Sequence, residues 1–377
     1  MIRVLQVCKT FKEVEGGIER VVDALAFSYS KTNEIRSSVI TTTIKQEQKE
    51  DLLYGEKVYF FPRNFTIASS PFSFSFFRNF KKIAKDYDVI HYHFPWPFMD
   101  ITHLLTAVKK PTVISYQSDI VRQKFFKSLY SPIMHAFFKK ADIITTSSQN
   151  LLDSSPALRN YKQKTIVIPI GLETEQYPEP SQERMSFWTE KLLNLGIKNE
   201  EPFLFIGTLR YYKGLEYLIK AVDGTNLKLL IIGEGLNRGF FEQMSKGKNV
   251  YFLGHVNEED KVALIRLCRA VVSPAHLRSE AFCISLLEGL MYSKPLISTE
   301  LRTGTSFVNY SGFTGLVVSP KDVMALRDAM QKLATDKDLY DRYKANTKTH
   351  YERHFRGHKV AQAFGDVYKK LLVNQKK

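Results

Sequence analysis

The sequence predicts an α/β protein built from two doubly wound, Rossmann-like domains that face each other across a cleft. Strand-like runs rich in Val and Ile alternate with segments of helical periodicity, which is typical of parallel strands covered on both faces. The rhythm breaks once, at 171–202, where two nearby prolines and a polar helical segment occur, and then restarts. We therefore expect domains over 1–171 and 172–354, with a C-terminal helix at about 355–377 packing back on the first.

The expected elements follow one another in a regular order. The first-half strands are apolar runs at 2–7, 38–42, 57–61, 89–93, 112–116, 143–146 and 165–168. The segments 17–30 and 121–138 carry apolar residues at helical spacing. The second-half strands are expected at 203–206, 228–232, 249–253, 270–273, 295–298 and 316–318. Strand ends and helix starts then line the cleft, where phosphates bind well.

The composition excludes several classes of protein. With 44% hydrophobic and 25% charged residues, the chain is neither disordered nor collagen-like. Its longest uncharged run, 303–320, is rich in Gly, Ser and Thr, which does not suit a membrane span, and 1–10 does not resemble a signal peptide. The three cysteines lack Cys-x-x-Cys spacing, which indicates a reducing cytoplasm and neither a disulfide scaffold nor a zinc site.

The net charge of +15 indicates acidic partners. Residues 57–140 hold 13 Lys and Arg against 4 Asp and Glu, a net +9. No nucleic-acid-binding motif accompanies this charge, so phosphate-bearing substrates or anionic lipid are expected, and nucleic acid is not. Aromatic and cationic residues interleave at 63–82 and 122–127, as at a membrane surface. The alternative is that these phenylalanines belong to the core and the lysines are ordinary surface residues.

A loop with two cations follows the strand expected at 203–206. Gly207 opens it, Arg210 and Lys213 stand three residues apart, and Gly214 precedes a helix. Such a pair of cations suits a diphosphate. The alternative is an ordinary basic loop.

Two glutamates, Glu280 and Glu288, flank the start of another predicted helix, 284–292. If both were helical they would lie about 12 Å apart on nearly one face. Carboxylates accept hydrogen bonds from hydroxyls, so this pair suits the sugar and the ribose of a nucleotide sugar, with the helix N-terminus at the diphosphate. A third loop, 300–306, contains Thr305 and offers backbone N–H groups to an anion.

Weaker signals lie in the first half. Gly16 and Gly17 form a turn at the head of a helix, without the spacing of a dinucleotide-binding motif. His91 and His93 alternate on one strand face, either at a substrate-facing strand end or in the packing of the sheet. The Asp-x-Asp at 86–88 directly precedes a strand, and we interpret it as the end of a helix. No metal site is therefore expected there.

Seven ordered blocks together resemble the retaining glycosyltransferases of the GT-B fold, specifically glycosyltransferase family four. The blocks are GGIERVV at 16–22, DVIHYHFPWP at 88–97, YQSDIVRQK at 116–124, VIPIGL at 167–172, GTLRYYKGLEYLI at 207–219, SEAFCISLLEG at 279–289 and TGTSFVN at 303–309. Within the family the chain looks most like bacterial mannosyltransferases of O-antigen or other surface polysaccharide synthesis.

The resemblance implies a donor site in the second domain and an acceptor site in the first. Arg210 and Lys213 would bind the diphosphate, Glu280 the donor sugar and Glu288 the ribose. The other residues implied on the donor side are Gly17, Gly207, His255, Arg278, Phe282, Cys283, Ile284 and Thr305. The residues expected on the acceptor side are His91, His93, Gln117 and Asp119.

The chain departs from the family pattern at three positions. Gln117 stands where many relatives have histidine, and an amide cannot act as a base at neutral pH, so Asp119 or the leaving diphosphate must take the proton. Thr208 replaces an arginine, which leaves Arg210 to substitute. Cys283 replaces a common glycine, and its thiol reactivity is left open.

The resulting hypothesis is a retaining, front-face transfer of a hexose without metal or other cofactor. GDP-mannose is the first donor candidate and UDP-sugars are the next, with a glycan or a polyprenyl-diphosphate-linked acceptor. The enzyme is expected in the cytoplasm, with peripheral attachment to the inner membrane face as an option. The alternatives are a sugar-nucleotide 2-epimerase of the same fold, and a non-catalytic protein that binds carbohydrate or nucleic acid.

Overall fold

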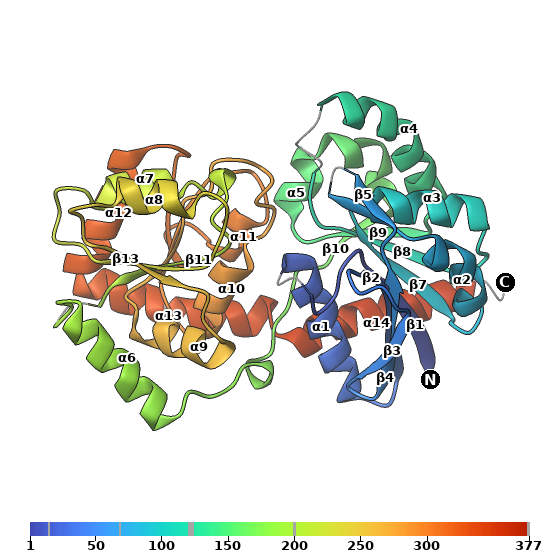
Figure 1. The fold of residues 1–377 in the computed structure, drawn as a ribbon, viewed down its shortest axis with the longest axis horizontal. Coiled ribbons are helices and arrows are strands. Elements are labelled where there is room, and N and C mark those ends of the chain that lie inside the picture. Colours follow the sequence, from blue (N-terminus) through green and yellow to red (C-terminus); the bar gives the residue numbers. More distant parts are fainter. Residues whose placement is uncertain (14–15, 68, 120–123, 199–200, 375–377) are drawn as a thin grey trace. The chain divides into compact units, whose positions relative to one another are not determined.

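The computed structural model describes residues 1–377 except 14–15, 68, 120–123, 199–200 and 375–377, and the side chains of 124–129 are also outside the description. The chain forms two compact units (Figure 1). Unit 1 comprises Met1–Glu173 and Arg356–Lys377, and unit 2 comprises Thr174–Phe355. Each unit is an α/β body around its own sheet.

Unit 1 is centred on an eight-stranded sheet of order β10-β9-β8-β7-β1-β2-β4-β3. Neighbouring strands are parallel except for the antiparallel pair β3 and β4. The strands are β1 (Ile2–Val7), β2 (Ile35–Thr43), β3 (Lys49–Leu53), β4 (Glu56–Pro62), β7 (Val89–Phe94), β8 (Thr112–Tyr116), β9 (Ile143–Thr146) and β10 (Thr165–Val167). A separate hairpin joins β5 (Phe65–Ile67) and β6 (Ser70–Phe72).

The helices of unit 1 turn one apolar face to this sheet. In α2, Phe76, Phe80 and Ala84 recur every four residues and are buried, and Ser73 caps the helix by accepting from the Phe76 N–H. The helices are α1 (Gly17–Ser30), α2 (Phe74–Ala84), α3 (Pro97–Thr106), α4 (Lys124–Lys140), α5 (Gln149–Ser154) and α14 (Gly357–Asn374), with a 3₁₀ segment at Pro156–Lys164. The C-terminal helix α14 lies beside α1 (Figure 1), where the Tyr29 hydroxyl donates to the Ala361 carbonyl.

Unit 2 is a parallel six-stranded sheet of order β13-β12-β11-β14-β15-β16, the doubly wound arrangement. Its strands are β11 (Phe203–Ile206), β12 (Leu229–Ile232), β13 (Val250–Gly254), β14 (Val271–Ser273), β15 (Leu296–Thr299) and β16 (Gly315–Val318). Its helices are α6 (Gln182–Asn194), α7 (Leu215–Val222), α8 (Arg238–Met244), α9 (Glu258–Leu267), α10 (Ile284–Met291), α11 (Thr305–Val308), α12 (Val323–Thr335) and α13 (Lys337–His354), with 3₁₀ turns at Thr174–Gln176 and Tyr211–Lys213. Ligands of such sheets bind at the carboxyl ends of the strands.

The structure differs from the sequence-based expectations at three places. The region 171–202 is not all connection, because α6 packs on α9, where Asp260 accepts hydrogen bonds from Arg184 and Trp188. The strand β3 was not predicted, because KEDLL is a charged edge strand without an apolar run. The β5–β6 hairpin was also missed. Among the described residues, no helix is both long and apolar enough to span a bilayer.

Candidate active site

The loop after β11 is shaped by two glycines. Gly207 has φ +154° and Gly214 has φ +72°, and the 3₁₀ turn Tyr211–Lys213 lies between them. A Cβ on Gly214 would lie 2.0 Å from the Pro274 carbonyl oxygen, so this position needs glycine for both backbone and space. The close approach brings the loop against the segment that follows β14. As a result, Lys213 faces Glu280.

Lys213 and Glu280 form a preformed ion pair in this site. The Lys213 Nζ lies 2.5 Å from Glu280 Oε2, and their side chains are 15% and 9% exposed. Burial works to lower the pKa of Lys213, but the Glu280 carboxylate outweighs it and the pKa is raised. Lys213 is therefore an ammonium at every physiological pH, and two of its three N–H groups are left for other acceptors.

Glu280 lies in the loop before the helix and only Glu288 is helical, so the two glutamates do not share one helical face. α10 begins only at Ile284, after Cys283, which has a left-handed φ of +68°. This turn directs Glu280 toward Lys213 and leaves Glu288 inside the helix. Burial and the nearby Glu280 carboxylate raise the pKa of the Cys283 thiol, so it stays protonated and unreactive at neutral pH.

Glu288 is also held by hydrogen-bond partners, which no local sequence pattern predicted. It is 3% exposed, and its Oε1 accepts from Lys261 at 2.7 Å and from the Tyr177 hydroxyl at 3.1 Å. Lys261 lies on α9, where it also pairs with Glu258 at 2.9 Å. The Glu258-x-x-Lys261 spacing on a helix is a signal for that pair, but nothing in the sequence links it to Glu288.

Three residues expected on the donor side make contacts within unit 2. Arg278 donates through Nη1 to the carbonyls of Leu301 and Arg302, so it holds two loops together. Phe282 is 4% exposed and packs against Phe355, with ring centroids 6.1 Å apart. Thr305 is 1% exposed, and its hydroxyl lies 3.1 Å from that of Thr303. The side chains of Phe282 and Thr305 are therefore buried, and their expected roles stay predictions.

The remaining donor-side predictions lie at strand and helix ends of unit 2. Arg210 is exposed on the loop after β11. His255 is exposed directly after β13, and Ile284 is the first residue of α10. Gly207 lies against Lys213, because a Cβ there would be 3.6 Å from its Nζ. These positions are compatible with the predicted roles and do not test them.

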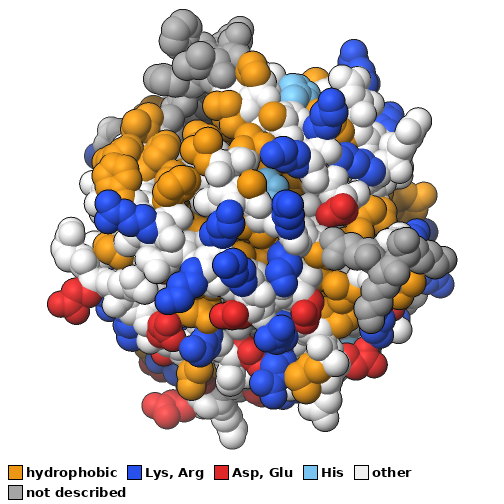
Figure 2. Space-filling view, turned by 90° about the vertical axis from the view of Figure 1, so that its right-hand side faces the viewer, with side chains coloured by type: hydrophobic (Ala, Val, Ile, Leu, Met, Phe, Trp, Pro, Cys, Tyr) orange, Lys and Arg blue, Asp and Glu red, His pale blue; other side chains and the backbone are white. Residues whose placement is uncertain are grey.

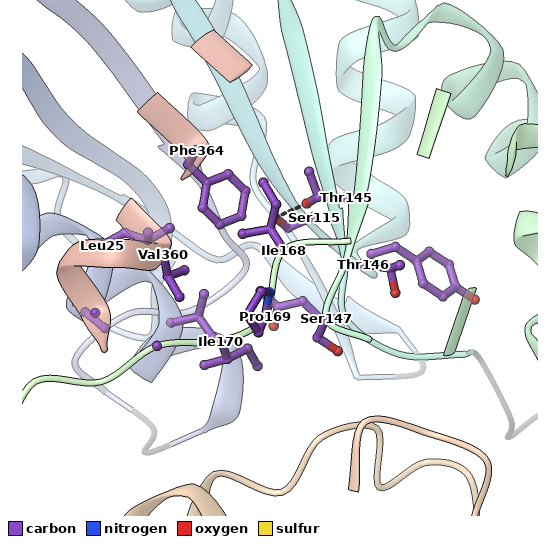
Figure 3. Close-up of a pocket in the computed structure, with 16 residues that line it drawn as sticks. Leu25, Ser115, Thr145, Thr146, Ser147, Ile168, Pro169, Ile170, Val360 and Phe364 are labelled. Atoms are coloured by element: carbon purple, nitrogen blue, oxygen red, sulfur yellow. Dashed lines mark hydrogen bonds between the residues drawn. The ribbon is translucent and has the colours of Figure 1, made fainter. Parts of the chain in front are cut away.

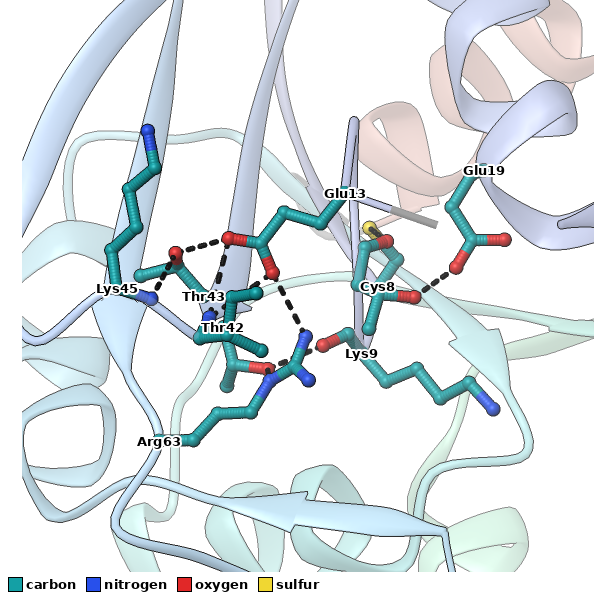
Figure 4. A network of polar contacts seen from close by, with 10 residues as sticks. Cys8, Lys9, Glu13, Glu19, Thr42, Thr43, Lys45 and Arg63 are labelled. Carbon is teal, nitrogen blue, oxygen red and sulfur yellow. Dashed lines mark hydrogen bonds and ion pairs between the residues drawn. The ribbon is translucent and has the colours of Figure 1, made fainter. Parts of the chain in front are cut away.

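In unit 1, a polar network holds residues 9–13, which follow β1 (Figure 4). Glu13 pairs with Arg63 at 3.1 Å and accepts from the hydroxyl of Thr43. The Thr42 hydroxyl donates to the Lys9 carbonyl at 2.5 Å. These bonds tie residues 9–13 to the ends of β2 and β4. Gly17, which was expected on the donor side, is the first residue of α1.

The two histidines predicted on the acceptor side lie inside the sheet instead. His91 and His93 are 0% and 1% exposed, which agrees with the alternative that they belong to the packing of the sheet. Gln117 and Asp119, the other two residues expected on the acceptor side, follow β8 and are half-buried. Asp119 accepts at 2.6 Å from the hydroxyl of Tyr116.

Comparison with known proteins identifies the family. Residues 190–350 match the family described as glycosyl transferases group 1, and 15–176 match glycosyltransferase family 4. D-rhamnosyltransferase WbpZ of Pseudomonas aeruginosa is 42% identical over 358 residues, covering 94% of this chain and 92% of that protein. O-antigen chain mannosyltransferase C of Escherichia coli is 40% identical over 378 residues, covering 99% of this chain and 100% of that protein. The chain belongs to this glycosyltransferase family.

Solved structures give the same fold for this glycosyltransferase. Anabaena Alr3699/HepE in complex with UDP and glucose has a TM-score of 0.77 at 15% identity, over 98% of this chain and 100% of that one. Sucrose-phosphate synthase from Thermosynechococcus elongatus has a TM-score of 0.75 at 16% identity, over 99% and 100%. The predicted family, the GT-B fold and the assignment as an enzyme are therefore confirmed. The predicted role of each site residue stays a prediction.

The glycosyltransferase offers no obvious metal centre in the part of the chain that is described. No group of three or more His, Cys, Asp or Glu side chains lies close enough together to hold an ion. The independence from metal that the sequence analysis predicts is a matter for experiment.

Gly214→Ala is expected to destabilise unit 2 and to slow the enzyme. The left-handed backbone alone costs about 1–2 kcal/mol for a residue with a Cβ, and the contact with Pro274 must also be relieved. Gly224→Ala is the matched control, because Gly224 has φ +71° and nothing within 4 Å of its Cβ. Urea unfolding and turnover should show a larger loss of both for Gly214→Ala. Equal losses in the two variants would argue against the role of this close approach.

Proposed function

We propose that this glycosyltransferase moves a hexose from a nucleoside-diphosphate sugar to a glycan or polyprenyl-diphosphate-linked acceptor in O-antigen or similar surface polysaccharide synthesis. GDP-mannose is the first donor candidate, because the Escherichia coli relative is named an O-antigen chain mannosyltransferase. The name of the Pseudomonas relative makes D-rhamnose the second candidate sugar. UDP-sugars are the third class. The site of action is the cytoplasm, where nucleotide sugars are available.

The buried pair of Lys213 and Glu280 carries this proposal. A diphosphate needs a fixed cation, and sugar hydroxyls need a fixed carboxylate, and the two lie 2.5 Å apart in one loop cluster. Glu288 adds a second buried carboxylate, which suits the ribose hydroxyls. Because Lys213 keeps its charge, it can stabilise the negative charge that grows on a departing diphosphate.

The proposed step retains the configuration at the donor C1. The bond from C1 to the diphosphate oxygen breaks, and the acceptor hydroxyl forms a new bond to C1 from the same face. The proton of that hydroxyl passes to the departing phosphate oxygen, so the products are the glycoside and the nucleoside diphosphate. Gln117 can accept a hydrogen bond but not the proton. Lys213 and Arg210 supply positive charge at the diphosphate, and the step as proposed needs no metal.

A panel of nucleotide sugars tests the donor. A ligand that binds only the folded protein raises the melting temperature, by an amount that grows with concentration over Kd. We expect GDP-mannose to give the largest shift, and the shift to shrink in Glu288→Gln. NMR of the product should then show that the anomeric configuration of the donor sugar is retained. No shift and no turnover with any nucleotide sugar would contradict the proposal, and turnover without an acceptor would indicate the epimerase.

The partner of the basic region is proposed to be an anionic membrane surface. We define the α2 face as the exposed residues Phe65, Ile67, Phe74, Arg78, Lys81, Lys82 and Lys85. Phe76 and Phe80, by contrast, are 0% and 1% exposed, so these two phenylalanines belong to the core and not to a membrane-facing surface. Figure 2 views the side of the molecule on which α2 lies and shows Lys and Arg side chains gathered among apolar ones. The other predicted stretch, 122–127, is outside the described residues.

Charge reversal on the α2 face should weaken binding to anionic liposomes. Each cation near such a surface contributes about 1 kcal/mol, so Arg78→Glu, Lys81→Glu and Lys82→Glu together should reduce binding on the order of 100-fold or more. The control carries Arg342→Glu, Lys344→Glu and Lys348→Glu, exposed residues of α13 in unit 2. Flotation with and without anionic lipid measures both. Equal binding of the two triple variants would dismiss the α2 face.

A further inference from the structure

A small pocket opens in unit 1 at the carboxyl ends of β8 and β9 (Figure 3). Its walls come from α1, from the segment Ile168–Gly171 and from α14, including Leu25, Val360 and Phe364. None of its 16 lining residues is charged. Its enclosed space of about 20 Å³ is close to what one water needs, so it admits a hydroxyl-bearing edge of a ligand and not a whole ring.

Two hydroxyls in this pocket lack hydrogen-bond partners among the described residues. Thr146 and Ser147 are 2% and 5% exposed, and the Oγ1 of the first and the Oγ of the second are both unpaired. Their neighbours are satisfied, since Thr145 bonds Ser115 at 2.9 Å and Ser148 caps α5. An unpaired buried hydroxyl costs about 1–3 kcal/mol of stability, so each of these two groups would gain from a hydrogen-bond partner.

Gln117 lines the same pocket, and buried residues fix how its amide is turned. The Gln6 amide nitrogen donates to Ser37, so Gln6 Oε1 accepts from His93 Nε2 at 2.8 Å. Burial lowers the pKa of His93 to about 3, so the ring is neutral and its Nδ1 is an acceptor. Gln117 therefore donates its Nε2–H to that Nδ1, at 3.0 Å. Its carbonyl oxygen is left to accept from something else.

We propose that this pocket, which we name the hydroxyl pocket, binds hydroxyls of the acceptor sugar through Thr146, Ser147 and the Gln117 carbonyl. Hydroxyl groups both donate and accept, which is what this set of partners requires. The apolar walls suit the C–H groups beside those hydroxyls on the edge of the sugar that enters. Because no charged residue lines it, the hydroxyl pocket takes the neutral sugar and not the diphosphate of a lipid-linked acceptor. Gln6 and His93 act as positioning residues. This inference rests on the proposed glycosyl transfer.

Removing the two hydroxyls tests the hydroxyl pocket directly. With the donor that turns over best, and octyl mannoside, glucoside, rhamnoside and N-acetylglucosaminide as acceptors, Ser147→Ala and Thr146→Val should each raise the acceptor KM about tenfold. Donor KM should not change. The melting temperature should stay equal or rise, because an unpaired polar group is lost. Ser70→Ala is the control, since Ser70 in β6 is also buried and unpaired but does not line the pocket.

Several results would overturn this assignment. An unchanged acceptor KM in both variants would show that the hydroxyls do not bind the acceptor. If the melting temperature also falls, the hydroxyls serve the fold. Donor hydrolysis without transfer to any octyl glycoside would contradict a neutral-sugar subsite. If no nucleotide sugar is turned over at all, the proposed function itself fails, and the wild-type enzyme shows this without any variant.

A second comparison tests the orientation of Gln117. His93→Phe should raise the acceptor KM, and it should add nothing in a Gln117→Ala background, because His93 acts through that amide. His91→Phe is the matched control, since His91 is equally buried and stacks on His93 but bonds Tyr368 and Ser115 instead. Both changes should lower the melting temperature alike. Equal acceptor KM values for the two histidine variants would contradict the positioning role.

Discussion

Lys213→Ala should lower turnover by about 10²-fold or more at saturating donor, on the scale of losing one group that stabilises an oxyanion. The removed ammonium is the buried cation proposed to bind the diphosphate, and its loss also leaves Glu280 without its partner at 2.5 Å. The fall should appear in kcat more than in KM, because the charge on the diphosphate grows in the transition state. Steady-state kinetics with a fixed acceptor measures this.

The control must separate catalysis from folding. Lys220→Ala, an exposed lysine of α7, should keep full turnover. Lys213→Ala combined with Glu280→Gln removes the unpaired charge, so it should recover stability but not turnover. The pKa of Lys213 is raised in the folded enzyme. Protonated Lys213 therefore contributes its full stability at pH values below its pKa in the unfolded chain, and this stability is lost only as the pH rises past its pKa in the folded enzyme. Near-normal turnover in Lys213→Ala would refute the assignment.

Lys261→Met should cost about 3–5 kcal/mol of unfolding free energy, because it removes one partner of a buried ion pair. The side chains of Lys261 and Glu288 are 9% and 4% exposed, so water cannot replace the lost partner. Two carboxylates, Glu258 and Glu288, would then face each other without a cation. The donor KM should rise as well, since Glu288 is proposed to hold the ribose. Urea unfolding and donor titration measure the two effects.

A double variant distinguishes the pair from general damage to α9. Adding Glu288→Gln to Lys261→Met should restore part of the lost stability, while the donor KM stays high. Lys246→Met, at an exposed lysine that follows α8, should change neither quantity. Additive losses in the double variant would mean that Lys261 and Glu288 do not depend on each other.

Much of the fold was predictable because the parallel strands are continuous apolar runs. The predicted strands at 2–7, 112–116, 143–146 and 203–206 have the observed bounds of β1, β8, β9 and β11. The antiparallel edge strand β3 was missed, since a strand with one solvent-facing side and three charges carries no apolar run. The C-terminal helix expected at about 355–377 corresponds to α14, which belongs to unit 1, whereas α13 before it belongs to unit 2.

The site was predictable where it depends on local spacing and not where it depends on long-range contacts. Lys213 and Glu280 were named from their loops, and the structure pairs them. The partners of Glu288, by contrast, come from α9 and from the segment after the 3₁₀ turn at Thr174–Gln176, which no local pattern joins to α10. For His91 and His93 the sequence left both a substrate-facing strand end and the packing of the sheet open, because alternation on a strand does not tell which end of the sheet a side chain approaches.

The central claim is that fixed positive side chains, and not a metal ion, carry the charge of the leaving diphosphate. Transfer from the best donor, measured in excess EDTA after prior dialysis against chelator, tests it most directly. We predict that the rate is retained, and that added Mg²⁺ or Mn²⁺ changes it less than twofold. A complete loss of transfer in EDTA, with recovery only on adding a divalent ion, would contradict the claim.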